Sequence, residues 1–213
     1  LTSGTVGGTT QTIIGGDLIE VVGGNQYQVA NTTFTGDPSL PASVQSNVTF
    51  SGAKVLTQNL EVLGDVAVNG AGASLDLLGD TLQLTGNFST LSSGVLVMQQ
   101  PTAVLGVDGS TTFDGGSTTG LLTDGVIYAA GPVTTLCCTT TALAPSGNHR
   151  FVLDGTAAQT VNLYSPGATT NRFWDLEIDN SAGVTFTSGV QVNNNLTLTI
   201  TGWWIVNSGT TTT

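Results

Sequence analysis

Hydrophobic and polar residues alternate in short runs along most of this chain, most clearly from Arg172 to Ile200. The runs there are Leu176/Ile178, Val184/Phe186, Val190/Val192 and Leu196/Leu198/Ile200, separated mostly by small polar residues and Gly. A period of two is typical of a strand with one buried face. No apolar stripe of helical period runs beyond about two turns. The pattern therefore predicts an all-β protein.

One phrase of this stretch occurs twice in the chain. Val48-Thr-Phe50 followed by Asn59-Leu60-Glu-Val62 matches Val184-Thr-Phe186 followed by Asn195-Leu196-Thr-Leu198, with the same spacing. Shorter echoes relate Leu60–Val68 to Leu75–Leu84, and Leu91–Val97 to Leu122–Tyr128. Reuse of a strand–turn–strand phrase is typical of repeat proteins.

Two architectures fit short strands divided by Gly-Asp, Asp-Gly and Ser-Gly turns. A parallel β-solenoid (β-helix) stacks short coils, and Asn and Thr at matching positions can then form ladders. Two β-sandwich domains are the alternative. We predict the solenoid, with residues 1–46 as a lead-in and first coils with a Pro-rich loop, 47–206 as the regular body, and 207–213 as a Thr-rich tail or linker.

Composition narrows the possible partners. Charged residues make up 8% of the chain, against about 25% in ordinary soluble domains, and 3 Lys+Arg against 14 Asp+Glu give a net charge of −11. So few cations argue against nucleic acid and against an anionic membrane surface. No apolar run approaches the roughly 18 residues of a spanning helix, so we expect no membrane insertion. The chain begins at Leu1 without a signal peptide, which suggests a processed or excised piece.

Three carboxylates, Asp175, Glu177 and Asp179, alternate with apolar residues and should share one strand face. One strand offers too few oxygens for Ca²⁺, and a glycosidase needs two carboxyls facing each other across a cleft. We expect a solvated acidic face, with Arg172 alongside to soften the repulsion.

His149 is the only histidine. Neither a Gly-x-Ser-x-Gly elbow nor a second histidine accompanies it, so a hydrolase or metal site lacks its other members. We expect a turn residue that opens the strand Phe151–Leu153. The sequence thus predicts no catalytic residue, no metal site and no cofactor.

Cys137 and Cys138 are adjacent. On a strand they point to opposite faces, so one should be buried and the other exposed. A mutual disulfide would need a distorted turn, whereas an exposed unpaired thiol could crosslink subunits.

Aromatic residues supply the remaining candidates for contact. Trp203 and Trp204 divide between the two faces of a strand, where one closes the last coil and the other is free for a contact. Tyr164 and Trp174 are candidates for stacking on a ligand. Four glycosylation sequons, at Asn31, Asn47, Asn87 and Asn195, are about the number expected by chance in a chain this rich in Ser and Thr.

The second half of the chain contains a set of short motifs: Ser146-Gly-Asn-His149, Phe151-Val-Leu-Asp-Gly155, Ala158-Gln-Thr-Val161, Arg172-Phe173, Asp175-Leu176 and Gly183-Val-Thr. These motifs resemble repeat segments of large secreted or cell-surface bacterial proteins that are β-helical and adhesin-like. The resemblance implies a β-helix and an extracellular location, and it brings no catalytic residues. The segment Leu136–Thr141, with its two cysteines, departs from the pattern.

These observations favour a non-enzymatic extracellular structural protein, a subunit of a surface filament, stalk or adhesin. The open ends of a solenoid present unpaired strands, so we expect contact through Ile13 and Ile14 at one end and Trp203, Trp204 and Ile205 at the other. The partner would be a second copy or a neighbouring domain of a longer chain. The alternatives are a module that binds surface glycans through Tyr164, Trp174 or Trp203, and a polysaccharide-degrading enzyme.

Overall fold

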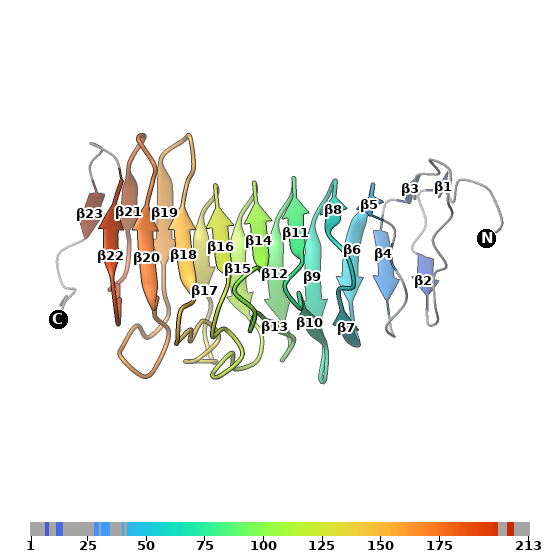
Figure 1. Ribbon diagram of the computed structural model, residues 1–213, viewed down its shortest axis with the longest axis horizontal. Helices are drawn as coiled ribbons and strands as arrows, with labels where there is room; N and C mark the ends of the chain where they lie inside the picture. The colour runs from blue at the N-terminus through green and yellow to red at the C-terminus, as the bar shows by residue number, and fades with distance from the viewer. Residues whose placement is uncertain are drawn as a thin grey trace.

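The structure, a computed structural model, describes residues 7–8, 12–14, 28–29, 31–34, 40, 42–199 and 204–206, with side chains at 33, 40, 42–199 and 205. These residues form a rod of parallel strands without a helix (Figure 1). The rod is a parallel β-solenoid of about 7 turns, which confirms the predicted fold. The sandwich alternative was wrong, because sandwiches pair their strands antiparallel and every strand pair here is parallel.

The strands form four sheets. In spatial order, the ten-stranded sheet contains β2 (Thr12–Ile14), β4 (Asn31–Phe34), β6 (Asn47–Phe50), β9 (Val66–Asn69), β12 (Phe88–Leu91), β15 (Thr111–Asp114), β17 (Val133–Thr135), β19 (Gln159–Asn162), β21 (Val184–Phe186) and β23 (Trp204–Val206). The eight-stranded sheet contains β22 (Leu196–Leu198), β20 (Asp175–Ile178), β18 (Arg150–Leu153), β16 (Val126–Ala129), β14 (Val104–Val107), β11 (Thr81–Leu84), β8 (Leu60–Val62) and β5 (Ser43–Val44). A three-stranded sheet contains β13 (Val95–Val97), β10 (Ser74–Asp76) and β7 (Ala53–Val55), and a two-stranded sheet contains β1 (Gly7–Gly8) and β3 (Gln28–Val29).

The coils up to β13 pass through the three larger sheets in a fixed order. The chain passes from β8 in the eight-stranded sheet to β9 in the ten-stranded sheet and β10 in the three-stranded sheet, then starts again at β11. Strand β6 pairs with β4 and β8 pairs with β5, so both larger sheets continue across the boundary that we placed between residues 46 and 47.

Alternation along each strand builds the core. In β9, Val66 and Val68 are buried, while Ala67 and Asn69 lie between core and surface. Coils then stack the inward residues in rows, so that Val66 is in register with Phe88 and Val68 with Thr90. The core is thus a column of apolar side chains enclosed by the sheets.

The two copies of the long repeated phrase, Val48–Val62 and Val184–Leu198, occupy equivalent positions in their coils. Both occupy the ten-stranded sheet first (β6 and β21) and the eight-stranded sheet next (β8 and β22). The shorter echoes do not mark equivalent positions. Leu60 begins β8 of the eight-stranded sheet, whereas Leu75 lies in β10 of the three-stranded sheet, so that echo relates two strands of a single coil.

The side of the rod that the three-stranded sheet forms changes its structure along the length of the rod. After β13 the three-stranded sheet gives way to an isolated bridge between Met98 and Leu122, and then to longer excursions at 136–149 and 163–174. These excursions form the loops below β17–β20 in Figure 1. Asn171 joins them, because its Nδ2 donates to the carbonyls of Tyr164 (2.6 Å) and Thr139 (3.3 Å) and its Oδ1 accepts from the Leu143 amide (2.9 Å).

Candidate functional site

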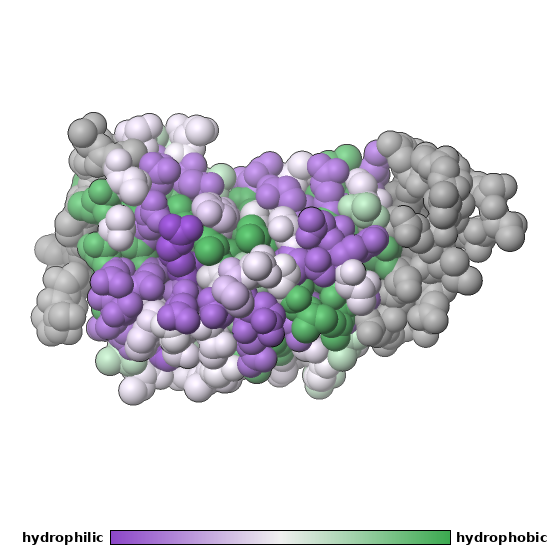
Figure 2. Space-filling model, viewed as in Figure 1, coloured by the Kyte–Doolittle hydropathy of each residue, from purple (hydrophilic) through white to green (hydrophobic). Residues whose placement is uncertain are grey.

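The C-terminal end of the eight-stranded sheet exposes its core-facing row. Leu196 is in register with the buried Leu176, and Leu198 with the buried Ile178. Both leucines nevertheless expose almost half of their surface, 47% and 48%. The reason is that β22 is the last strand of this sheet, and within the described part of the chain no strand pairs with its outer edge. Figure 2 shows hydrophobic surface over β22.

The structure describes the predicted contact residues only in part. Ile205 is exposed and is in register with Thr185, so it belongs to the outward row of its sheet. Trp204 takes the register position of the buried Val184. The side chains of Trp204, Ile13 and Ile14, and the whole of Trp203, lie outside the described residues. The exposure of Leu196 and Leu198 could not be predicted from the sequence, because they alternate with polar residues in the same way as any buried row.

The three alternating carboxylates Asp175, Glu177 and Asp179 form an acidic row on β20, and two of them interact with neighbouring coils. Glu177 forms an ion pair with Arg150 on the neighbouring strand, with 2.7 Å between Oε2 and Nη1. The Asp175 Oδ1 accepts hydrogen bonds from Nδ2 of Asn194 (2.8 Å) and from the amide of Asn195 (3.0 Å). Asp179 follows β20 and is exposed. The row therefore stabilises adjacent coils.

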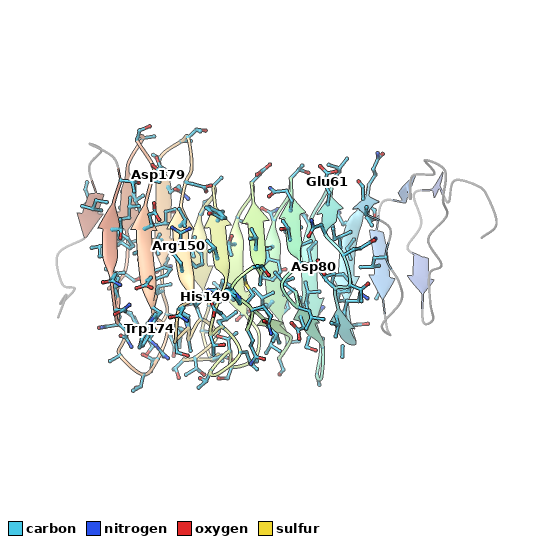
Figure 3. All side chains as sticks on the ribbon, in the orientation of Figure 1. Glu61, Asp80, His149, Arg150, Trp174 and Asp179 are labelled. Atoms are coloured by element: carbon cyan, nitrogen blue, oxygen red, sulfur yellow. The ribbon has the colours of Figure 1, made fainter. Side chains whose placement is uncertain are left out.

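The expectation for Arg172 was wrong. Its side chain is buried, and its guanidinium donates to the carbonyls of Pro145 (3.1 Å), Thr170 (2.9 Å) and Ala144 (3.3 Å). Burial lowers the pKa of Arg172. The excursions place backbone carbonyls inside the molecule without strand partners, and a guanidinium with five N–H donors satisfies several of them at once. Arg150 is the cation that stands by the acidic row (Figure 3).

His149 directly precedes β18, as predicted, but it is fully buried. Its Nδ1 lies 2.8 Å from the carbonyl oxygen of Asp124, and burial lowers its pKa to about 4. Nε2 is buried with no hydrogen-bond partner among the described residues. A neutral imidazole sealed from solvent holds a turn in place and has no access to a substrate.

The two candidate stacking residues differ in exposure. Tyr164 is exposed in the excursion 163–174, and its backbone amide donates to Oγ1 of Thr135 (2.6 Å). Trp174 is half-buried, and its Nε1 is buried without a partner in the described region. Figure 3 places Trp174 and His149 on the side of the rod that carries the excursions. Tyr164 can therefore offer its ring to a ligand, whereas Trp174 keeps its N–H inside.

The expectation for the cysteines was also wrong. The strand β17 ends at Thr135, and Cys137 and Cys138 lie in a bend where both side chains are exposed. Cys138 has φ of 93°, and its Sγ lies 2.9 Å from that of Cys137. The prediction assumed that the strand continued; the positive φ instead turns both thiols to the same side.

A shallow hollow on the outer face of the eight-stranded sheet was not found from the sequence. Its volume is about 150 Å³, and its lining includes Gln83, Gly106, Asp108, Tyr128 and Asp154. Gln83, Gly106 and Tyr128 are in register on consecutive strands, and the side-chain amide of Gln83 lies over Gly106, where any larger residue would collide with it. Burial, together with the charges of Asp179 and Asp108, raises the pKa of Asp154. The sequence offered one signal for this hollow: a glycine inside a strand often marks a place where a ligand or another backbone segment approaches closely.

Neither a metal cluster nor a membrane helix occurs in the part of the chain that the structure describes. Nowhere in it do three or more His, Cys, Asp or Glu side chains gather around a common point. No helix of the described residues has the length and apolarity needed to cross a bilayer. Comparison with known protein families, curated proteins and solved structures finds no match for the chain.

Proposed function

We propose that this chain is a non-enzymatic structural subunit that assembles end to end into an extracellular filament, stalk or adhesin. The observation that supports this most is the exposed core-facing row of Leu196 and Leu198 at the end of the eight-stranded sheet. The partner is a second copy of the chain or the next coils of a longer protein. In either case its first strand continues the sheet beyond β22.

Two kinds of interaction would stabilise such a joint. An open strand edge carries N–H and C=O groups that pair with an added strand. Covering what remains exposed of each leucine contributes about 1 kcal/mol, at roughly 25 cal/mol per Å² of apolar surface. Neither interaction involves a charged group, because β22 consists of Leu, Thr and Leu.

The test is electron microscopy of the purified protein across a dilution series, comparing wild type with Leu198→Asp. We expect wild type to form fibres with a fixed axial repeat and Leu198→Asp to give short rods. Leu63→Asp is the matched control, because Leu63 is 41% exposed on the turn after β8, away from the coil end. Short rods for wild type at every concentration would rule out a second copy as the partner and leave the next coils of a longer protein. Equal loss of fibres in both variants would contradict the role of β22.

A second candidate function, glycan binding, is favoured by the hollow at Gly106. Sugars are held by aromatic rings and by side chains that accept or donate several hydrogen bonds, and Tyr128, Gln83 and Asp108 surround this hollow. A glycan panel probed with Tyr128→Ala and Tyr164→Ala distinguishes two possible sites. Loss of binding only in Tyr128→Ala assigns the hollow, and loss only in Tyr164→Ala assigns the excursion. A wild-type protein that binds no glycan on the panel contradicts this function.

A further inference from the structure

The bend that carries Cys137 and Cys138 is held on both sides. Before it, Oγ1 of Thr135 accepts a hydrogen bond from the Tyr164 amide (2.6 Å). After it, the carbonyl of Thr139 accepts one from Asn171 (3.3 Å). The cysteines are therefore presented on a fixed turn between two anchors.

The backbone conformation of this turn keeps the sulfurs together. A non-glycine residue with φ near +93° is in a sparsely populated region, which costs on the order of 1–3 kcal/mol and persists only where the surroundings enforce it. Here it brings the two Sγ atoms to 2.9 Å, where Cys138 donates its S–H to Cys137. Both thiols are exposed, so a small oxidant can reach them.

We propose that Cys137 and Cys138 form a disulfide with each other, making this bend a site of reversible oxidation on the side of the rod. The oxidant is a small disulfide such as oxidised glutathione. The Cys137 thiolate attacks it, an S–S bond forms to one glutathione, and the other leaves as a thiol. Cys138 then loses its proton and attacks the Cys137 sulfur, which releases the second glutathione as a thiol. The protein pair loses two electrons and two protons in total, and the small disulfide gains them.

The order of attack follows from the contact between the thiols. The hydrogen bond to Cys137, and then the charge of Cys137, raise the pKa of Cys138. The S–H of Cys138 donates to the sulfur of Cys137, so this hydrogen bond stabilises a thiolate at Cys137, which is the first nucleophile. Because the thiolate is the reactive form, the slower residue acts as the resolving cysteine.

The ring that results is strained. Adjacent Cα atoms lie about 3.8 Å apart, below the roughly 4.4–6.8 Å usual for a disulfide. Strained, exposed disulfides are reduced more readily than buried structural ones. We therefore expect the bond to form with oxidised glutathione and to open again with mild dithiol reductant. A crosslink between subunits is disfavoured, because the neighbouring thiol is closer than any thiol of another molecule.

The experiment measures the mass and thiol content of the whole chain. The protein is reduced, freed of reductant, incubated with or without oxidised glutathione, and alkylated with iodoacetamide. We expect two alkyl groups without the oxidant. With it we expect none, at a monomer mass lower by two hydrogen atoms. Treatment with dithiothreitol should restore both alkylation sites.

The variants Cys137→Ser and Cys138→Ser serve as controls, since each keeps one exposed thiol that cannot close the ring. After the same oxidation both should carry a bound glutathione or run as disulfide-linked dimers in a non-reducing gel. The proposal is overturned if oxidised wild type still accepts two alkyl groups, retains glutathione, or forms the same dimers as the variants.

Discussion

Two buried threonines, Thr90 and Thr111, show how single residues adjust the core. Each is in register with a phenylalanine of an adjacent coil: Thr90 with Phe113, and Thr111 with Phe88. The two rings contact each other at 6.1 Å between centroids. The small side chains make room for the large ones, as close packing requires. The cost is that both threonine Oγ1 atoms are buried without a hydrogen-bond partner among the described residues.

We therefore expect Thr90→Val or Thr111→Val to raise the free energy of unfolding by about 1 kcal/mol, since valine has nearly the same shape and no hydroxyl to desolvate. Thr135→Val is the matched control. Thr135 is equally buried, but its Oγ1 accepts the Tyr164 amide, so this change should destabilise the protein by about 1–2 kcal/mol. Denaturant unfolding measures all three. Equal effects at the three positions would contradict the reasoning.

His149 links stability to pH. Its pKa is lowered to about 4 in the folded protein, against about 6.5 in the unfolded chain, so between these values the unfolded state binds more protons. The contribution of His149 is thus complete above pH 6.5 and is lost as the pH falls toward 4, by an amount of about 3 kcal/mol.

The measurement is the free energy of unfolding of wild type and His149→Gln at a series of pH values. We expect the difference between the two proteins to shrink as the pH falls from about 7 to about 4, because only wild type must exclude a proton. A difference that is constant over this range would show that His149 does not titrate on unfolding.

At the scale of elements, a polar ladder connects successive coils where the chain turns into the ten-stranded sheet. The Oδ1 of Asn47 accepts the amide of Asp65 (2.9 Å), Oδ1 of Asp65 accepts the amide of Asn87 (2.7 Å), and Oδ1 of Asn87 accepts the amide of Ser110 (2.8 Å). Each side chain satisfies a backbone donor of the next coil. The next position in register is Pro132, which has no N–H to offer.

Asn87→Ala should destabilise the protein by about 1–3 kcal/mol, because it leaves the Ser110 amide without its acceptor. Asn162→Ala, at an exposed strand position, should change the free energy of unfolding by less than about 0.5 kcal/mol. Denaturant unfolding compares the two variants, and similar losses would show that the ladder contributes nothing of its own.

The ladder also changes the interpretation of the sequons. Nδ2 of Asn87 donates to Asp65, and Nδ2 of Asn195 donates to Asp175, both at 3.0 Å. A glycan attached to either nitrogen would take the place of a hydrogen bond between coils. Each of these two Asn-x-Ser/Thr triplets consists of an Asn that bonds to the neighbouring coil, a core-facing apolar residue and an outward hydroxyl residue.

Strand positions could be predicted from the sequence, because alternation is a local property. The sheet to which each strand belongs could not be predicted, because strands of the three-, eight- and ten-stranded sheets share one alternating pattern. Leu60 resembles Leu75 as much as it resembles its true partner Leu82. The side-chain contacts between coils could not be predicted for a related reason. Arg172 bonds to carbonyls of another coil, and the hollow at Gly106 depends on Gln83 and Tyr128 of adjacent coils. Such pairs are set by stacking, which only the complete register reveals.

At the scale of the whole molecule, the distribution of charge separates the side of the rod from its end. The described acidic residues include an outward row on β20, whereas β22 carries none. An assembly through coil ends should therefore respond weakly to salt, which screens charges over about 10 Å at 0.1 M. We expect fibres of the same length distribution from 0.05 to about 0.5 M NaCl by electron microscopy. Fibres that dissolve in the higher salt would point to association through the charged sides.

The parallel register also determines how the rod would carry mechanical load. Strands β2 and β23 stand at opposite ends of the ten-stranded sheet, and the hydrogen bonds between coils run along the line that joins them. Tension along this line loads the coils in series, so the weakest coil yields first while its neighbours remain intact. Equivalent positions of neighbouring coils lie between 16 residues (Asn31 to Asn47) and 28 residues (Val133 to Val161) apart. Each coil that is pulled out would therefore lengthen the chain by roughly 50–95 Å. In a force–extension trace such a rod would act as a shock absorber that gives way in steps of unequal length, the longest where the excursions lengthen the coil.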